Sequence, residues 1–127
     1  AQLKKLKNFL KNKKKIHSNY CRLFENNKNF SMLKPHNFYK SNFWLNVLII
    51  KNNKKKLKNI ISNLRKSNIE ARPIWKANHL QKPYRQYQKY KIEKAEKITN
   101  SYICLPSSPN LTFQEQKKIY KIINMKK

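Results

Sequence analysis

Few side chains in this sequence could carry out chemistry. The chain has 127 residues with five acids, three histidines and two cysteines, and it contains no glycine. Every acid is a glutamate, so composition excludes a Ser-His-Asp triad, and the lack of glycine excludes a glycine-rich phosphate loop. The histidines (His17, His36 and His79) have no ligand spacing to one another, whereas a zinc site needs about four ligands. We therefore expect neither a metal site nor a complete catalytic apparatus in these 127 residues.

The strongest candidate for ligand binding is the stretch 69–84, which reads IEARPIWKANHLQKPY. Arg72 stands directly before Pro73, and a residue in that position is biased toward an extended backbone. An extended arginine at the end of a strand can direct its guanidinium fork toward a carboxylate or a phosphate. The alternative is that Arg72 forms a surface ion pair with Glu70.

Three further side chains in this stretch suit an anionic ligand with a ring. Trp75 offers a flat surface, Lys76 adds a positive charge, and His79 can donate or accept a proton near neutral pH. Trp75 is also a candidate for the core, and a lone histidine is usually structural. With Arg72, these residues form the predicted binding site.

The elements that must position these residues follow from hydrophobic spacing. Apolar residues recur at helical steps in four segments, and short β-branched or aromatic runs stand between them. The sequence therefore predicts an α+β fold of two layers, with three to four helices packed on a short, three-stranded, largely antiparallel sheet. The predicted helices span 1–26, 56–66, 92–102 and a last segment from 112 onward, and the strands span 43–50, 69–74 and 103–105.

Three local signals refine these boundaries. Asn68 follows the second helix, and asparagine is the next-best residue after glycine for the left-handed position that ends a helix. Thr112 and Glu115 have the spacing of a capping box at the start of the last helix. Asn46 lies inside the most apolar strand, so it must find a hydrogen-bond partner if it is buried.

The charge of the chain is extreme, with 31 Lys and Arg against 5 acids and a formal net charge of +26. The lysines are scattered, and the enriched residues are those with AT-rich codons, so drift in composition is one explanation. A nucleic-acid-binding protein is the other, because tyrosines alternate with cations in 82–91 (KPYRQYQKYK). A structural or interaction domain is a third reading.

No stretch reaches the roughly 18–20 apolar residues of a membrane span. The two cysteines, Cys21 and Cys104, lack metal-ligand spacing. We expect reduced thiols in a cytoplasmic protein by default. The alternative is a disulfide, which forms only if their Cα atoms lie within about 7 Å.

The order of motifs resembles the late region of the DegT/DnrJ/EryC1/StrS family of sugar-nucleotide aminotransferases, which are pyridoxal-phosphate enzymes. The resemblance extends over essentially all 127 residues. One departure is Asn68, where the family has glycine. The matching positions are 1–6 (AQLKKL), Ile69, Ala71-Arg72-Pro73, Trp75, His79-Leu80-Gln81 and 104–119 (CLPSSPNLTFQEQKKI).

The resemblance implies that 1–127 form the C-terminal small domain of a fold-type I aminotransferase. The large domain, with the Schiff-base lysine and the other contacts to pyridoxal 5′-phosphate, is expected upstream, so the chain alone should be inactive. In the whole enzyme, a homodimer, glutamate would supply the amino group and a UDP-linked 4-keto-6-deoxy sugar would accept it, in cell-surface polysaccharide biosynthesis. His79 would reach this substrate across the dimer interface, and Arg72, Trp75 and Lys76 would also contact it.

Overall fold

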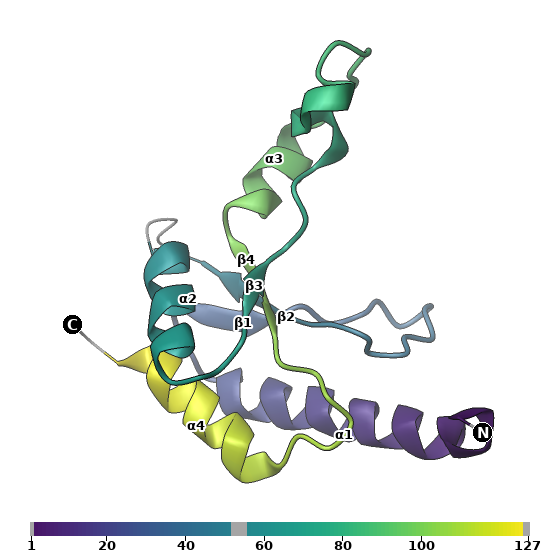
Figure 1. Ribbon diagram of the computed structural model, residues 1–127, viewed down its shortest axis with the longest axis vertical. Helices are drawn as coiled ribbons and strands as arrows, with labels where there is room; N and C mark the ends of the chain where they lie inside the picture. The colour runs from purple at the N-terminus through teal and green to yellow at the C-terminus, as the bar shows by residue number, and fades with distance from the viewer. Residues whose placement is uncertain (1, 52–55, 126–127) are drawn as a thin grey trace.

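A four-stranded antiparallel sheet forms the centre of the molecule in a computed structural model, which describes residues 2–51 and 56–125 (Figure 1). The strand order is β1-β2-β4-β3, so β2 and β4 occupy the middle. Leu48 of β2 lies opposite Ile103 of β4, and both are fully buried. The strands are β1 (Phe30–Met32), β2 (Asn46–Ile50), β3 (Arg72–Pro73) and β4 (Tyr102–Leu105).

Helices α1, α2 and α4 form the second layer and share one hydrophobic core with the sheet (Figure 1). The predicted α+β fold with two layers is confirmed, and the sheet has one strand more than expected. None of the helices in the described residues is long and apolar enough to cross a membrane. The helices are α1 (Leu6–Phe24), α2 (Lys56–Lys66), α3 (Glu93–Thr99) and α4 (Phe113–Asn124), and the 3-10 turns are η1 (Gln2–Lys5), η2 (Asn78–Leu80) and η3 (Lys82–Tyr84).

The additional strand, β1, lies in the connection 26–42, where the sequence has a short apolar run at 30–33 but predicted no strand. Phe30 and Met32 are buried with a half-buried Ser31 between them, which is the alternation of a strand with one face on the core. The side chain of Asn27 accepts hydrogen bonds from the backbone N–H groups of Asn29 and Phe30, and so fixes the turn that leads into the strand. Three residues were too few for the periodicity to be recognised.

The first turns of α1 do not contribute to the core. Leu3, Leu6 and Leu10 have the spacing of an apolar helix face, which predicts that they join the core, but they are 82%, 45% and 40% exposed. The buried residues of the helix begin at Ile16. The reason is geometric, because the N-terminal half of α1 extends beyond the sheet (Figure 1).

Two helix boundaries have the geometry that the sequence predicted. Asn68 adopts a left-handed conformation with φ of 57° just after α2, so it takes the place that glycine would occupy. The Thr112 hydroxyl accepts a hydrogen bond from the Glu115 N–H, and the Glu115 carboxylate accepts one from the Thr112 N–H. This capping box starts α4.

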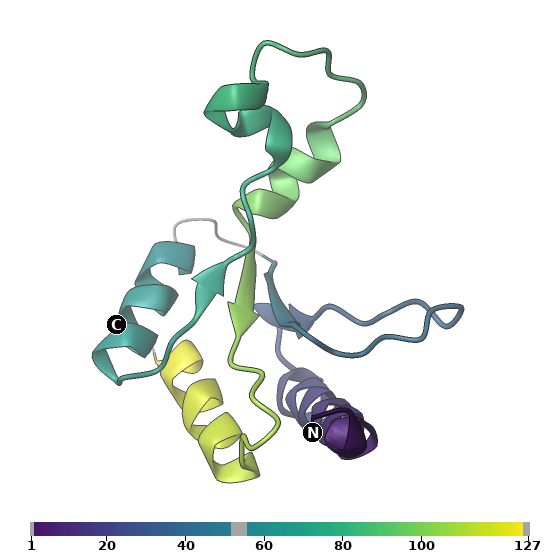
Figure 2. The same ribbon diagram turned by 45° about the vertical axis from the view of Figure 1, so that its right-hand side comes forward.

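Two long connections project from the compact body (Figures 1 and 2). Residues 33–45 join β1 to β2 and form an extended loop. Residues 74–101 join β3 to β4 and carry η2, η3 and α3 away from the sheet; we call this segment the arm. The predicted binding site lies at the base of the arm and along it.

Candidate functional site

Arg72 lies in β3, at the edge of the sheet. Its guanidinium donates hydrogen bonds to the Glu70 carboxylate, with Nε 2.9 Å from Oε1, and the side chain is 75% exposed. The ion pair with Glu70, which the sequence offered as the alternative to ligand binding, is present. Because the pair is open to solvent, it is worth about 0–1 kcal/mol, and an incoming anion can compete for the guanidinium.

Trp75 is an exposed residue and not part of the core, with 67% of its surface accessible. Its ring centroid lies 5.8 Å from that of Trp44, at an interplanar angle of 37°. Trp44 comes from the loop 33–45 and is itself 61% exposed. Two aromatic rings from separate connections therefore stand together beside the sheet.

A shallow pocket of about 290 Å³ joins Trp44 to Arg72. Lys13 of α1 enters its wall and donates a hydrogen bond from Nζ to the Ser107 carbonyl oxygen at 2.7 Å. Burial lowers the pKa of Lys13 from its ordinary value. The pocket thus combines two cationic side chains and an indole ring, which suits a ligand with an anionic group and a flat ring. The other lining residues are Leu45, Glu70, Cys104, Leu105 and Ser107.

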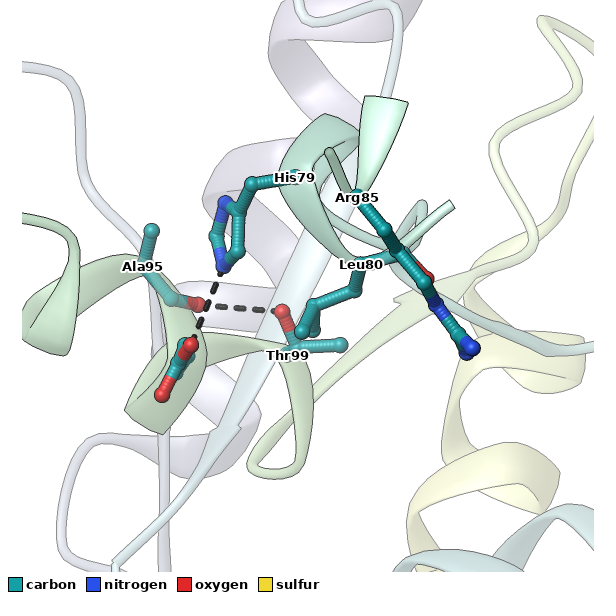
Figure 3. Close-up of polar contacts among 6 residues, drawn as sticks. His79, Leu80, Arg85, Ala95 and Thr99 are labelled. Atoms are coloured by element: carbon teal, nitrogen blue, oxygen red, sulfur yellow. Dashed lines mark hydrogen bonds and ion pairs between the residues drawn. The ribbon is translucent and has the colours of Figure 1, made fainter. Parts of the chain in front are cut away.

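His79 lies in η2 of the arm and faces α3 (Figure 3). Its Nε2 is 3.2 Å from Oε1 of Glu96, and its side chain is only 13% exposed. The turn that carries it is held by Arg85, whose Nε donates to the Leu80 carbonyl oxygen at 3.2 Å. The contact with Glu96 orients the imidazole of His79 within the arm.

The four residues predicted for binding therefore divide into two groups. Arg72 and Trp75 meet Trp44 at the base of the arm. His79 contacts α3, and Lys76 is exposed, with its carbonyl oxygen accepting a hydrogen bond from Gln81 Nε2 at 2.9 Å. Sequence reasoning missed Trp44 because this aromatic residue was included in the predicted strand 43–50, whereas β2 begins at Asn46. The Ser41-Asn42 pair just before it was the signal for a turn.

The pocket that Trp44 and Arg72 line does not have the features of a site for pyridoxal phosphate. Such a site needs a lysine amine directed into an enclosed cavity, and Lys13 instead donates to Ser107 at the wall of an open pocket. Across the described part of the chain, no group of three or more His, Cys, Asp or Glu side chains could hold a metal ion. The side chains of the pocket have the chemistry that an anionic, ring-bearing ligand would require.

Comparison with known proteins gives this geometry a context. The model of the DegT/DnrJ/EryC1/StrS aminotransferase family matches residues 1–124. EpsN of Bacillus subtilis, named as a pyridoxal phosphate-dependent aminotransferase, is 34% identical over 87 residues, which are 65% of this chain and 22% of EpsN. The chain therefore spans about a fifth of the length of that relative.

Solved structures share the fold at low sequence identity. The sugar aminotransferase Spr1654 of Streptococcus pneumoniae superposes with a TM-score of 0.86 and 21% identity, covering 96% of this chain and 31% of that one. Escherichia coli GDP-4-keto-6-deoxy-D-mannose-3-dehydratase superposes with a TM-score of 0.82 and 22% identity, covering 97% and 33%. At these identities the likeness concerns the fold alone. The family model extends over nearly the whole sequence, however, and by that match the chain belongs to the DegT/DnrJ/EryC1/StrS aminotransferase family.

Proposed function

We propose that this chain is the C-terminal small domain of a pyridoxal-phosphate-dependent nucleotide-sugar aminotransferase. The observation that carries the proposal is the family match over residues 1–124. The chain spans about a third of the length of the solved structures it matches, so the cofactor is assigned to a large domain outside these 127 residues. When bound there, the cofactor supplies the electron sink, while protein groups bind and orient the substrate.

The substrate we propose is a UDP-linked 4-keto-6-deoxy sugar, with glutamate as the amino donor. Arg72 and Lys76 carry the positive charge that a diphosphate requires, and the exposed rings of Trp44 and Trp75 offer stacking surfaces. His79, held by Glu96, contacts the substrate when the arm approaches the second subunit of a homodimer. We place this enzyme in the cytoplasm and in cell-surface polysaccharide biosynthesis.

Tryptophan fluorescence tests the binding part of the proposal. The chain has two tryptophans, and both stand at the base of the arm, so their emission reports on this site alone. Titration of the 127-residue chain with UDP-glucose should quench the emission, and Arg72→Gln should weaken binding about tenfold. Arg22→Gln on α1 removes the same charge elsewhere and should leave the affinity within twofold. Equal losses in both variants would show non-specific charge attraction and refute the site.

The reaction requires the complete, cofactor-loaded enzyme. Incubation with glutamate and the UDP-linked keto sugar should give an amino sugar, detected by mass spectrometry, and His79→Ala should reduce kcat/KM for the sugar while cofactor absorbance stays unchanged. Since one structural neighbour is a dehydratase, a product that has lost oxygen without gaining nitrogen would refute aminotransfer. Unaltered kinetics of His79→Ala would refute the role of the arm.

A further inference from the structure

A second group of reactive side chains lies between α1 and β2. His17 is 8% exposed, and its Nδ1 is 3.0 Å from Oδ1 of Asn46. The other ring nitrogen, Nε2, is 3.4 Å from Sγ of Cys21, one helical turn further along α1. A thiol, an imidazole and an amide thus stand in a row.

The hydrogen bonds of this row determine which imidazole nitrogen carries the proton. The Ser107 hydroxyl donates to the Phe43 carbonyl oxygen, and Asn46 Nδ2 donates to Ser107 Oγ at 3.0 Å. The amide oxygen of Asn46 therefore faces His17 and accepts a hydrogen bond from Nδ1–H, so Nδ1 carries the proton of the neutral ring. The lone pair of Nε2 is left pointing at Cys21, so the thiol donates to the imidazole.

The surroundings keep His17 neutral and ready to accept that proton. Burial lowers its pKa, and the positive charge of Lys34 lowers it further, against the opposing effect of the bond to Asn46. The ring of Phe43 stacks on the imidazole at a centroid distance of 4.5 Å. At neutral pH the ring is therefore an available base beside a half-buried thiol.

We propose that Cys21 is a site of covalent modification by small neutral disulfides, with His17 as its general base and Asn46 as the residue that orients the ring. His17 Nε2 takes the thiol proton as Sγ attacks one sulfur of the disulfide. A new S–S bond forms, the old one breaks, and the released thiolate takes up the proton. The exchange conserves electrons, so no further oxidant is needed.

Cys104 provides an internal control. It is also half-buried, and burial raises its pKa, but no hydrogen bond of its thiol is found among the residues that the structure describes. The pKa of Cys21 is also raised, by burial and by Glu25 against the lowering effect of Lys34, so the surroundings favour the thiol over the thiolate at both cysteines. A reaction at Cys21 that is both faster and constant with pH would then come from His17, because attack by a thiolate alone speeds up as pH rises.

Hydroxyethyl disulfide, a small neutral probe, tests the proposal on two single-cysteine chains. Cys104→Ser leaves Cys21 and Cys21→Ser leaves Cys104, and mass spectrometry of the mixed disulfide gives both rates. We expect Cys21 to react at least about tenfold faster at neutral pH. Its rate should be nearly constant between about pH 7 and pH 8, whereas the rate of Cys104 should rise about tenfold, as expected for direct attack by a thiolate.

A third chain, His17→Gln in the Cys104→Ser background, removes the base and keeps a polar side chain facing Asn46. Its rate should fall about tenfold and acquire the pH dependence of Cys104. If this variant does not fold, the pH profiles of the first two chains decide the question without it. Equal rates, or parallel pH profiles for the two cysteines, would overturn the proposal.

Discussion

At the level of single side chains, the polar residues buried in the hydrophobic core are all hydrogen-bonded in the part of the chain that the structure describes. Asn46 and Gln116 are both 0% exposed. Gln116 donates to the Ile16 carbonyl oxygen at 2.9 Å and accepts from Asn19 Nδ2 at 3.0 Å. Over the described ranges, no buried side-chain nitrogen or oxygen lacks a partner. Since an unpaired buried group costs about 1–3 kcal/mol, these contacts are needed for folding.

Stability should depend on pH through His17. Burial lowers the pKa of His17 below the ordinary 6.5, so the unfolded chain binds the proton more readily than the folded one. The contribution of neutral His17 to the free energy of unfolding is therefore complete above about pH 6.5 and is lost as pH falls toward the folded-state pKa. The total loss is about 1.4 kcal/mol for each unit by which the folded-state pKa lies below the unfolded-state pKa.

Urea unfolding of the wild-type chain at a series of pH values measures this effect. His17→Gln should reduce the loss of stability on acidification, whereas His36→Gln, at an exposed histidine, should retain it. A wild-type free energy of unfolding that stays constant from about pH 7 to pH 5 would contradict the prediction.

The candidate site was partly predictable at this scale. The ion pair of Arg72 with Glu70 and the need of Asn46 for a partner both follow from local sequence and chemistry. The contact between Trp44 and Trp75 does not, because these two residues are 31 positions apart in separate connections, and the contact depends on where both connections leave the sheet. The role of His79 in substrate binding stays a prediction.

At the scale of elements, the ends of helices were easier to predict than their packing. The capping box of α4 and the left-handed Asn68 depend on neighbouring residues, and both signals are local. The short strand β1 was not predicted, because its three residues form a strand only by pairing with β2, and so short a pattern carries too little information. The edge strand β3 lies within the predicted strand 69–74.

The cap of α4 should contribute measurably to stability. Thr112→Ala removes the hydroxyl that accepts from the Glu115 N–H and should lower the free energy of unfolding by about 1 kcal/mol. Thr99→Ala on α3 deletes a hydroxyl that donates to the Ala95 carbonyl oxygen and should change it by less than about 0.5 kcal/mol. Chemical denaturation measures both, and a cap variant no less stable than the control would contradict the role of the box.

The contact between His79 and Glu96 should hold η2 against α3 within the arm. Because the carboxylate is half exposed, we expect the pair to contribute about 0.2–1 kcal/mol, or up to roughly fivefold in local opening. Glu96→Gln should therefore speed amide hydrogen exchange in residues 74–101 and leave the sheet unchanged. Glu93→Gln removes the same charge from the start of α3 without touching His79. Equal exchange in the two variants would argue against the contact.

At the scale of the whole molecule, the apolar residues determine the fold, and the positive charge affects its stability. The fold class followed from the apolar pattern even though the net charge is +26, because the core uses the spacing of Leu, Ile and Phe and the lysines occupy solvent-facing positions. The lysines instead create self-repulsion, which weakens the compact state. Lys7, Lys11 and Lys15, which we call the lysine row, lie four residues apart on the exposed side of α1, so their like charges are neighbours on one helix face.

Salt should therefore stabilise this protein. The Debye length falls from about 10 Å at 0.1 M to about 3 Å at 1 M salt, so added sodium chloride screens the repulsion and should raise Tm by several degrees.

Lys11→Glu lowers the net charge from +26 to +24 and converts two repulsive pairs of the lysine row, Lys7 with Lys11 and Lys11 with Lys15, into attractive ones, each worth about 0.2–0.5 kcal/mol. This variant should have the higher Tm at low salt and lose that advantage at high salt, whereas Lys11→Gln should fall between the two chains. Calorimetry at both ionic strengths measures the difference, and a wild-type Tm that does not respond to salt would mean that the positive charges are too well solvated to oppose folding.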